Sequence, residues 1–174
     1  MPKGKKPLEK ELYQPMREYL EIGFNKSSGH CHLEITADGN FSEKLKSVVR
    51  HNIVFSFLGK KASPDLAGFT VKDPIRWATE LFLSVGSADI QDFITVEIKR
   101  EKITPQDIYQ AKMYGDLFYA KFALLISPEP IPEEIKRLHK ELYVLGRFMS
   151  GWQVYIGQWF NSPPSISWFP NNPF

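Results

Sequence analysis

At residues 93–99 the chain reads FITVEIK. β-Branched and aromatic residues dominate this stretch, which predicts a β-strand. Side chains two positions apart on a strand share a face, so Glu97 and Lys99 project together. The apolar side chains on either side of Glu97 point to the opposite face. Burying a carboxylate and an ammonium on an apolar strand is costly, so the pair indicates a function at this end of the strand.

A second carboxylate, Asp65, follows Pro64 in the stretch SPDL at residues 63–66, at the predicted start of another strand. Two carboxylates that converge with a lysine can hold a hard divalent cation and orient a water beside a phosphate. This arrangement resembles the PD-(D/E)XK nuclease superfamily. Pro64-Asp65 and Glu97-Ile98-Lys99 stand where the motif of that superfamily stands.

The resemblance implies a phosphodiester hydrolase that acts on DNA and depends on Mg²⁺, with Mn²⁺ as a substitute. Asp65, Glu97 and Lys99 would be the catalytic residues. Asp65 and Glu97 would bind the metal together with the backbone carbonyl of Ile98, and Lys99 would position the attacking water or stabilise the transition state. Many members also carry a metal-site acid on the first helix. Glu18 is the candidate for that role, and Glu11 and Glu21 compete with it.

The chain contains a second E-x-K triplet, Glu134-Ile135-Lys136, which lies in a different context. Apolar residues recur at helical spacing from Ile135 onward, behind two prolines, so this triplet belongs to the first turns of an amphipathic helix. Glu134 and Lys136 then point in different directions. We therefore expect them to be solvated and assign the chemistry to the strand triplet.

A helix is predicted directly after the strand triplet, from Pro105 to about Tyr119, with Thr104 as its N-cap. Gln110 and Tyr114 are four positions apart and share one face of this helix. They resemble the Q-x-x-x-Y element of one branch of the superfamily, the nuclease domains of recombination helicase-nucleases. The resemblance implies that both residues contact DNA or support the metal site.

Net charge is only +2, which does not by itself argue for a nucleic-acid partner. Basic residues nevertheless flank the motif, since Lys61 precedes Asp65 and Arg100 follows Lys99. Cations beside a carboxylate cluster suit an enzyme that holds a polyanion over a metal. Lys61 and Arg100 are therefore the further candidates for substrate binding.

Length and composition favour a folded globular protein. The chain has 174 residues, of which 43% are hydrophobic and 14% aromatic, enough for a sizeable core. We expect one nuclease-like domain over residues 1–150, and a C-terminal strand with an aromatic, proline-rich tail over 151–174 that packs on the domain or on a partner. No apolar stretch approaches the roughly 20 residues that cross a bilayer. A lone cysteine, Cys31, agrees with a reducing compartment, so we expect a cytoplasmic protein without a membrane partner.

Periodicity predicts helices over 7–22, 42–49, 105–119 and 132–148, and strands over 29–36, 52–58, 66–72, 93–99, 122–126 and 152–156. The step from a helix into strand 122–126 predicts a β-α-β crossover and a small mixed sheet flanked by helices. The order α-β-β-β-α-β with additions is the restriction-endonuclease-like α/β core that the resemblance implies. Between Asp65 and Glu97 lie 31 residues, which predict an extra strand or a substrate-facing insertion.

Other chemistry has weaker support. His30 and His32 share a strand face, but no second cysteine completes a recognisable zinc site. The sequence has neither a G-x-x-x-x-G-K-[ST] phosphate loop nor a G-x-S-x-G nucleophile elbow.

Two other function classes stay open. A catalytically silent DNA-binding or assembly module with the same fold would bind DNA without cutting it. A structural or interaction protein would use Glu97 and Lys99 as an ion pair and have no affinity for nucleic acid. Within the nuclease class, repair, recombination and defence all remain open. So does a homodimer, because small junction resolvases and restriction-type enzymes commonly act as dimers.

Overall fold

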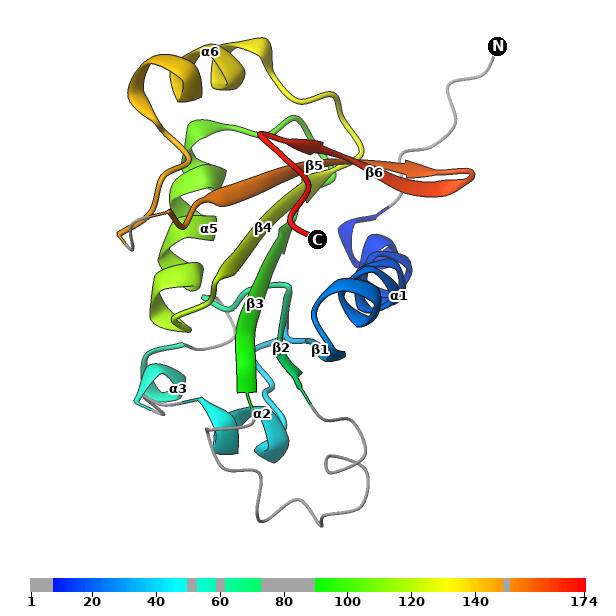
Figure 1. Ribbon diagram of the computed structural model, residues 1–174, viewed down its shortest axis with the longest axis vertical. Helices are drawn as coiled ribbons and strands as arrows, with labels where there is room; N and C mark the ends of the chain where they lie inside the picture. Colours follow the sequence, from blue (N-terminus) through cyan, green and yellow to red (C-terminus); the bar gives the residue numbers. More distant parts are fainter. Residues whose placement is uncertain (1–7, 50–52, 59–61, 73–89, 149–150) are drawn as a thin grey trace.

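The protein is built on a six-stranded mixed β-sheet flanked by helices (Figure 1). The computed structural model describes residues 8–49, 53–58, 62–72, 90–148 and 151–174. In the sheet the strands follow their sequence order: β1 (His30–Ile35), β2 (Leu66–Val71), β3 (Ile90–Ile98), β4 (Phe122–Ser127), β5 (Val154–Asn161) and β6 (Pro164–Phe169). The first three strands are antiparallel, β3, β4 and β5 are parallel, and β6 returns antiparallel to β5. The predicted mixed α/β architecture is confirmed at this level.

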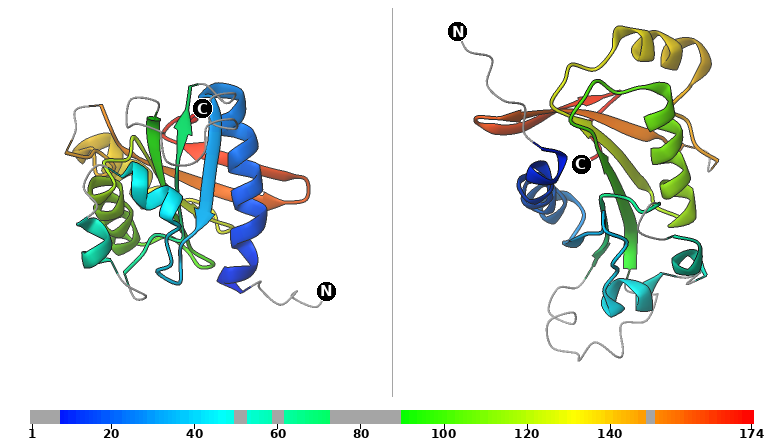
Figure 2. Two further views of the ribbon diagram at one scale, coloured as in Figure 1. Left: turned by 90° about the horizontal axis from the view of Figure 1, so that it is seen from below. Right: turned by 180° about the vertical axis from the view of Figure 1, so that it is seen from behind.

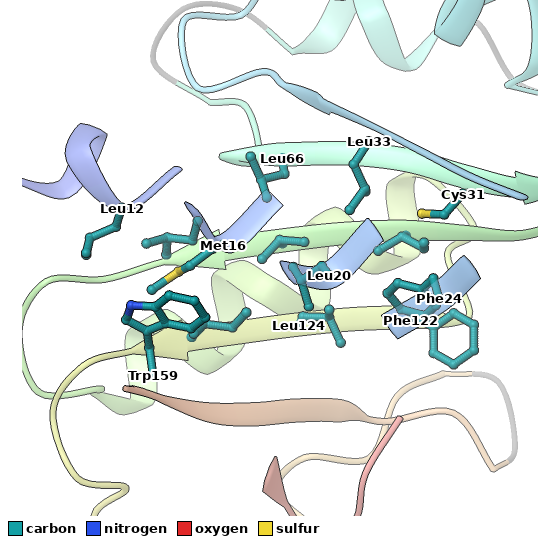
Figure 3. Packing of buried hydrophobic residues seen from close by; sticks show 14 residues of the cluster. Leu12, Met16, Leu20, Phe24, Cys31, Leu33, Leu66, Phe122, Leu124 and Trp159 are labelled. Atoms are coloured by element: carbon teal, nitrogen blue, oxygen red, sulfur yellow. The ribbon is translucent and has the colours of Figure 1, made fainter. Parts of the chain in front are cut away.

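Helix α1 (Glu9–Ser27) covers one face of the sheet (Figures 1 and 2). Its buried side chains recur every four residues, at Leu12, Met16, Leu20 and Phe24, so they form one stripe along the helix. Figure 3 shows this stripe lying on the apolar side chains of the strands, among them Leu66 and Leu124. Val96 and Ile98 of β3 belong to the same cluster, so they face α1.

Helix α5 (Pro105–Leu117) lies on the opposite face and connects β3 to the parallel strand β4. This is the predicted β-α-β crossover. Helix α5 begins at the predicted Thr104 cap. The Thr104 hydroxyl accepts from the Asp107 N–H, and Asp107 Oδ2 accepts from the Thr104 N–H at 2.8 Å. Such reciprocal capping satisfies two of the free donors at the start of a helix. The helix ends at Leu117, two residues before the predicted end.

The remaining helices are shorter: α2 (Glu43–Val48), α3 (Val54–Phe57) and α6 (Glu133–Leu142). The predicted cap of α2 is confirmed, since the Ser42 side chain accepts from the Leu45 N–H. Residues of α2 and α3 pack with Tyr114 and Phe118. Ile135 of α6 packs with Ile108 of α5.

Several other predicted elements differ from the structure, among them α1, which continues to Ser27 instead of Ile22, and β3, which begins at Ile90 instead of Phe93. The segment predicted as a strand at 52–58 contains helix α3, and its buried residues Val54 and Leu58 are four apart, as helical packing requires. Helix α6 ends at Leu142 instead of Phe148, because Tyr143 adopts a left-handed conformation (φ 50°) that stops the helix. Strand β5 starts at Val154 instead of Trp152 and continues to Asn161.

The C-terminal tail forms the β5–β6 hairpin and then turns back onto α1. The ring of Phe174 lies 5.0 Å from that of Phe24, centroid to centroid, and 5.8 Å from that of Trp168. The predicted insertion before β3 falls largely on residues 73–89, outside the described residues. Among the described residues, no helix combines the length and the apolar character that crossing a membrane requires.

Candidate functional site

The register of β2 against β3 brings Asp65 and Glu97 together. Leu66 pairs with Val96 in this antiparallel ladder, so Asp65, one position earlier, lies opposite Glu97, one position later. Residues directly opposite on antiparallel strands share a face of the sheet. Because Val96 faces α1, the pair lies on the face that α5 covers, at the end of β3 from which the chain leads into α5.

Asp65 is held firmly from two sides. Its Oδ2 accepts from the backbone N–H of Ile98 at 2.7 Å, and the side chain is 7% exposed. Its backbone carbonyl accepts from the N–H of Thr36 at 2.8 Å. The buried Thr36 hydroxyl donates to the carbonyl of Pro64 at 2.6 Å. The end of β1 therefore fixes the Pro64-Asp65 step against the end of β3.

Glu97 is 2% exposed and only half paired. Its Oε2 lies 3.1 Å from Lys99 Nζ, whereas its buried Oε1 has no hydrogen-bond partner among the described residues. Buried carboxylate oxygens without a hydrogen-bond partner are rare because their desolvation is costly. This oxygen is therefore available to a ligand that enters the site.

The surroundings raise the pKa of both carboxylates. Burial raises the pKa of Asp65, although the Ile98 N–H and the Tyr13 hydroxyl favour its charged form. Burial and the charge of Asp65 raise the pKa of Glu97, and Lys99 offsets this only in part. Desolvation opposes the charge of Lys99, but Glu97 and its other acidic neighbours outweigh it and raise the pKa of Lys99. The cluster thus combines a stable cation with two carboxylates that gain from further positive charge.

Helix α5 brings both residues of the Gln110 and Tyr114 pair to the cluster. Lys99 Nζ donates to Gln110 Oε1 at 3.3 Å, and Gln110 Nε2 donates to the Tyr114 hydroxyl at 3.5 Å. Asp107 Oδ1 lies 3.8 Å from Lys99 Nζ. Lys99 is therefore held between the end of its own strand and the first turns of α5.

No family model, curated protein or solved structure matches this chain. Within the described residues there is also no group of three or more His, Cys, Asp and Glu side chains arranged to hold a metal ion. The function has to be argued from the geometry of the Asp65 and Glu97 cluster itself.

Helix α1 brings Glu9 to the cluster, whereas Glu18, the residue selected from the sequence, lies away from it. Glu9 raises the pKa of both Asp65 and Glu97 through its charge. Glu18 is exposed and accepts from Gln14 Nε2 at 2.5 Å. Nine positions at about 100° per residue place Glu9 and Glu18 on opposite sides of a helix, about 14 Å apart along its axis.

Tyr13 is a site neighbour that sequence reasoning missed. Its hydroxyl donates to Glu9 Oε1 at 3.3 Å and lies beside the Asp65 carboxylate. The four-residue spacing of Glu9 and Tyr13 was visible in the sequence, but only the docking of α1 shows which end meets the sheet. The competing acids have other roles, because Glu11 accepts from the Leu8 N–H and Glu21 from the Leu33 N–H.

The remaining candidates lie at the margin of the site or beyond it. Arg100 is exposed and pairs with Glu101 at 3.2 Å. Ile98 ends β3, where its N–H is engaged by Asp65. Lys61 lies outside the described residues. In the second triplet Glu134 is exposed on α6, and Lys136 pairs with Glu133 at 2.5 Å.

Proposed function

We propose that this protein is a divalent-metal-dependent DNA nuclease with a restriction-endonuclease-like core. The observation that carries the proposal is the convergence of Asp65, Glu97 and Lys99 at one buried point. Asp65 and Glu97 come from different strands and are paired only by the register of the sheet. The order α1-β1-β2-β3-α5-β4, with α2 and α3 added between β1 and β2, supports the proposal, because it is the α-β-β-β-α-β order with additions that the motif resemblance implies.

The donor set fits a hard divalent cation. The unpaired Oε1 of Glu97 and the raised pKa values of Asp65 and Glu97 are the features of a cluster that a cation would stabilise. Asp65, Glu97 and the carbonyl of Ile98 would hold Mg²⁺, which commonly keeps several water ligands and needs few protein groups. Glu9 adds a further negative charge from α1. When bound, such an ion lowers the pKa of a water ligand and offsets charge on the scissile phosphate.

Lys99 contributes a fixed positive charge beside the reacting phosphate. Its ammonium lies within 3.3 Å of both Glu97 Oε2 and Gln110 Oε1, so its direction is set before substrate enters. An ammonium in this place orients the attacking water and stabilises the extra negative charge of the transition state. Gln110 holds Lys99, and the Tyr114 hydroxyl in turn holds Gln110.

Cleavage of a small DNA panel by the purified protein tests the proposal. Single-stranded, duplex, flapped and four-way-junction DNA are incubated with Mg²⁺, Mn²⁺ or EDTA. We expect metal-dependent cutting that Asp65→Ala, Glu97→Ala and Lys99→Ala each abolish, while circular dichroism shows the same fold. The matched control is Glu134→Ala in the second E-x-K triplet, which should cut like the unmodified protein.

The same panel separates the alternatives. DNA binding without cutting under any metal condition would support a catalytically silent binding or assembly module. Full activity of a folded Lys99→Ala variant would contradict the assignment of this site. The preferred substrate distinguishes a repair or recombination role from a restriction-type role. Analytical ultracentrifugation with and without DNA tests whether the protein forms a homodimer.

A further inference from the structure

A pocket separate from the proposed nuclease site lies between α6 and the end of β6. This surface pocket has a volume of about 540 Å³, within the usual range for small-molecule sites. Its cationic lining residues are Lys136, Arg137 and Lys140, and no carboxylate of the described residues lines it. Neither Arg137 nor Lys140 forms an ion pair with any described residue. Charge complementarity therefore points to an anionic occupant.

The rest of the lining is aromatic. The His139 ring meets Tyr143 edge-on at 5.9 Å and Phe169 edge-on at 5.6 Å, centroid to centroid. Tyr143 is 74% exposed, so most of its ring is free to contact a ligand. Burial and the nearby charge of Lys112 lower the pKa of His139, which keeps this ring neutral near pH 7. Planar rings beside mobile cations suit a ligand that joins a flat base to a phosphate.

This pocket lies on the same face of the sheet as the nuclease site we propose, since Leu125, the β4 partner of Glu97, packs in one cluster with Ile135 of α6 and Phe169. Helix α5 extends between the two, because Gln110 contacts Lys99 and Lys112, on another side of the same helix, acts through its charge on His139. On α6, His139 follows Ile135 by about 6 Å along the axis, and Ile135 packs against Ile108 of α5. Figure 1 shows α6 beyond the end of the sheet at which α5 begins. A single strand that extends from Asp65 and Glu97 across this face could reach the pocket.

We propose that the pocket binds one nucleotide of a single DNA strand, with its base stacked on Tyr143 and its phosphate at Arg137 and Lys140. The inference rests on the proposed nuclease function and adds a preference for substrates with an unpaired strand. Duplex DNA is a poor occupant because its bases have no free faces for stacking. A free nucleotide lacks the rest of the strand that the nuclease site would hold.

Fluorescence anisotropy tests the proposal with the full chain in EDTA, which separates binding from cleavage. The probes are a labelled single-stranded oligonucleotide and the matching duplex. Tyr143→Asn removes the ring, and asparagine tolerates the left-handed backbone at this position. The Arg137→Gln/Lys140→Gln variant removes two charges from exposed helix positions. Phe57→Ala and Lys26→Gln/Lys46→Gln are controls on other elements, where Phe57 and Lys26 are exposed and the Lys46 side chain is 40% exposed and pairs with Glu43.

We expect Tyr143→Asn to weaken single-strand binding about tenfold and to leave duplex binding and the salt dependence unchanged. Arg137→Gln/Lys140→Gln should weaken binding and reduce the slope of log K against log salt by about 0.7, the value for one phosphate of a single strand. Unchanged single-strand binding by both variants would overturn the proposal. An equal loss on duplex DNA, or displacement of the oligonucleotide by dAMP at equal concentration, would also overturn it.

The two proposals fail separately. If the unmodified protein cuts DNA while the pocket variants bind like the controls, only the pocket assignment is wrong. If the pocket variants lose single-strand binding while no condition yields cutting, the pocket assignment stands without the nuclease.

Discussion

Glu97 shows how a single residue departs from the usual rules of burial. It is almost fully buried, paired through one oxygen, and unpaired through the other among the described residues. A folded protein keeps such a group at a cost in stability, which is a common feature of functional sites. Lys99 pairs with its Oε2 and is itself held by Asp107 and Gln110, and none of these contacts involves Oε1.

Replacement of Glu97 by glutamine should stabilise the protein at alkaline pH. Because the folded-state pKa of Glu97 is raised, the folded state holds more protons than the unfolded state above the ordinary glutamate pKa. The contribution of Glu97 to the free energy of unfolding in EDTA therefore falls as pH rises above about 4.3. At about pH 8, Glu97→Gln should raise the free energy of unfolding by about 1 kcal/mol or more.

Thermal melts of both proteins across this pH range, in EDTA, check the effect. Glu134→Gln on α6 is the control and should follow the unmodified protein at every pH. If the melting temperatures of Glu97→Gln and the unmodified protein change with pH in the same way, the pKa of Glu97 is not raised in the folded protein. Added Mg²⁺ should raise the melting temperature of the unmodified protein more than that of Glu97→Gln, because metal binding to the folded state stabilises it.

Glu9 and Glu18 offer a matched pair on one helix. Glu9→Gln removes a negative charge that acts on both Asp65 and Glu97, so the Mg²⁺ concentration for half-maximal cleavage should rise severalfold. Glu18→Gln changes an exposed residue on the other side of α1 and should leave this concentration unchanged. Metal titrations of the cleavage rate measure both. An equal shift in the two variants would mean that general surface charge is responsible.

At the scale of elements, α5 both packs against the sheet and positions side chains of the site. Its buried face holds Ile108 and Tyr114 against the sheet, while Asp107 and Gln110 reach Lys99. The capping contacts of Thr104 fix where this helix begins and therefore where those side chains lie. The same element thus stabilises the fold and sets the direction of the Lys99 ammonium.

Loss of the α5 cap should be costly. Thr104→Ala removes the side-chain acceptor for the Asp107 N–H and should lower the free energy of unfolding by about 1 kcal/mol. Urea denaturation measures this value. Thr104→Ser keeps the hydroxyl and should retain most of the stability. If both variants unfold at the same urea concentration, the cap contributes little to this helix.

At the scale of the whole molecule, the C-terminal tail ties the β5–β6 hairpin to α1. Phe174 packs on Phe24 and Trp168, and a side chain on Gly23 would come within 2.8 Å of its ring. The first helix and the last residue are therefore joined in one hydrophobic cluster.

Phe174→Ala should destabilise the protein by roughly 1–3 kcal/mol, below the range for a fully buried phenylalanine because this ring is half-exposed. Phe148→Ala is the control, since that side chain is 90% exposed, and should change stability little. Equal melting temperatures for Phe174→Ala and the unmodified protein would contradict a stabilising role of the tail.

The sequence by itself determined the features that depend on neighbours along the chain. The strand character of residues 93–99, the Thr104 cap, the face shared by Gln110 and Tyr114, and the difference between the two E-x-K triplets all follow from local periodicity and capping chemistry. The helix within 52–58 was missed because short apolar runs fit a strand and a helix equally well.

Only the tertiary structure decided which distant residues meet. Asp65 lies opposite Glu97 because of the β2–β3 register, and a shift of one residue would place it on the other face of the sheet. The docking of α1 selects Glu9 over Glu18, and the pairing of β6 with β5 brings Phe169 to Tyr143. These contacts depend on burial summed over many side chains, which no short stretch of sequence encodes.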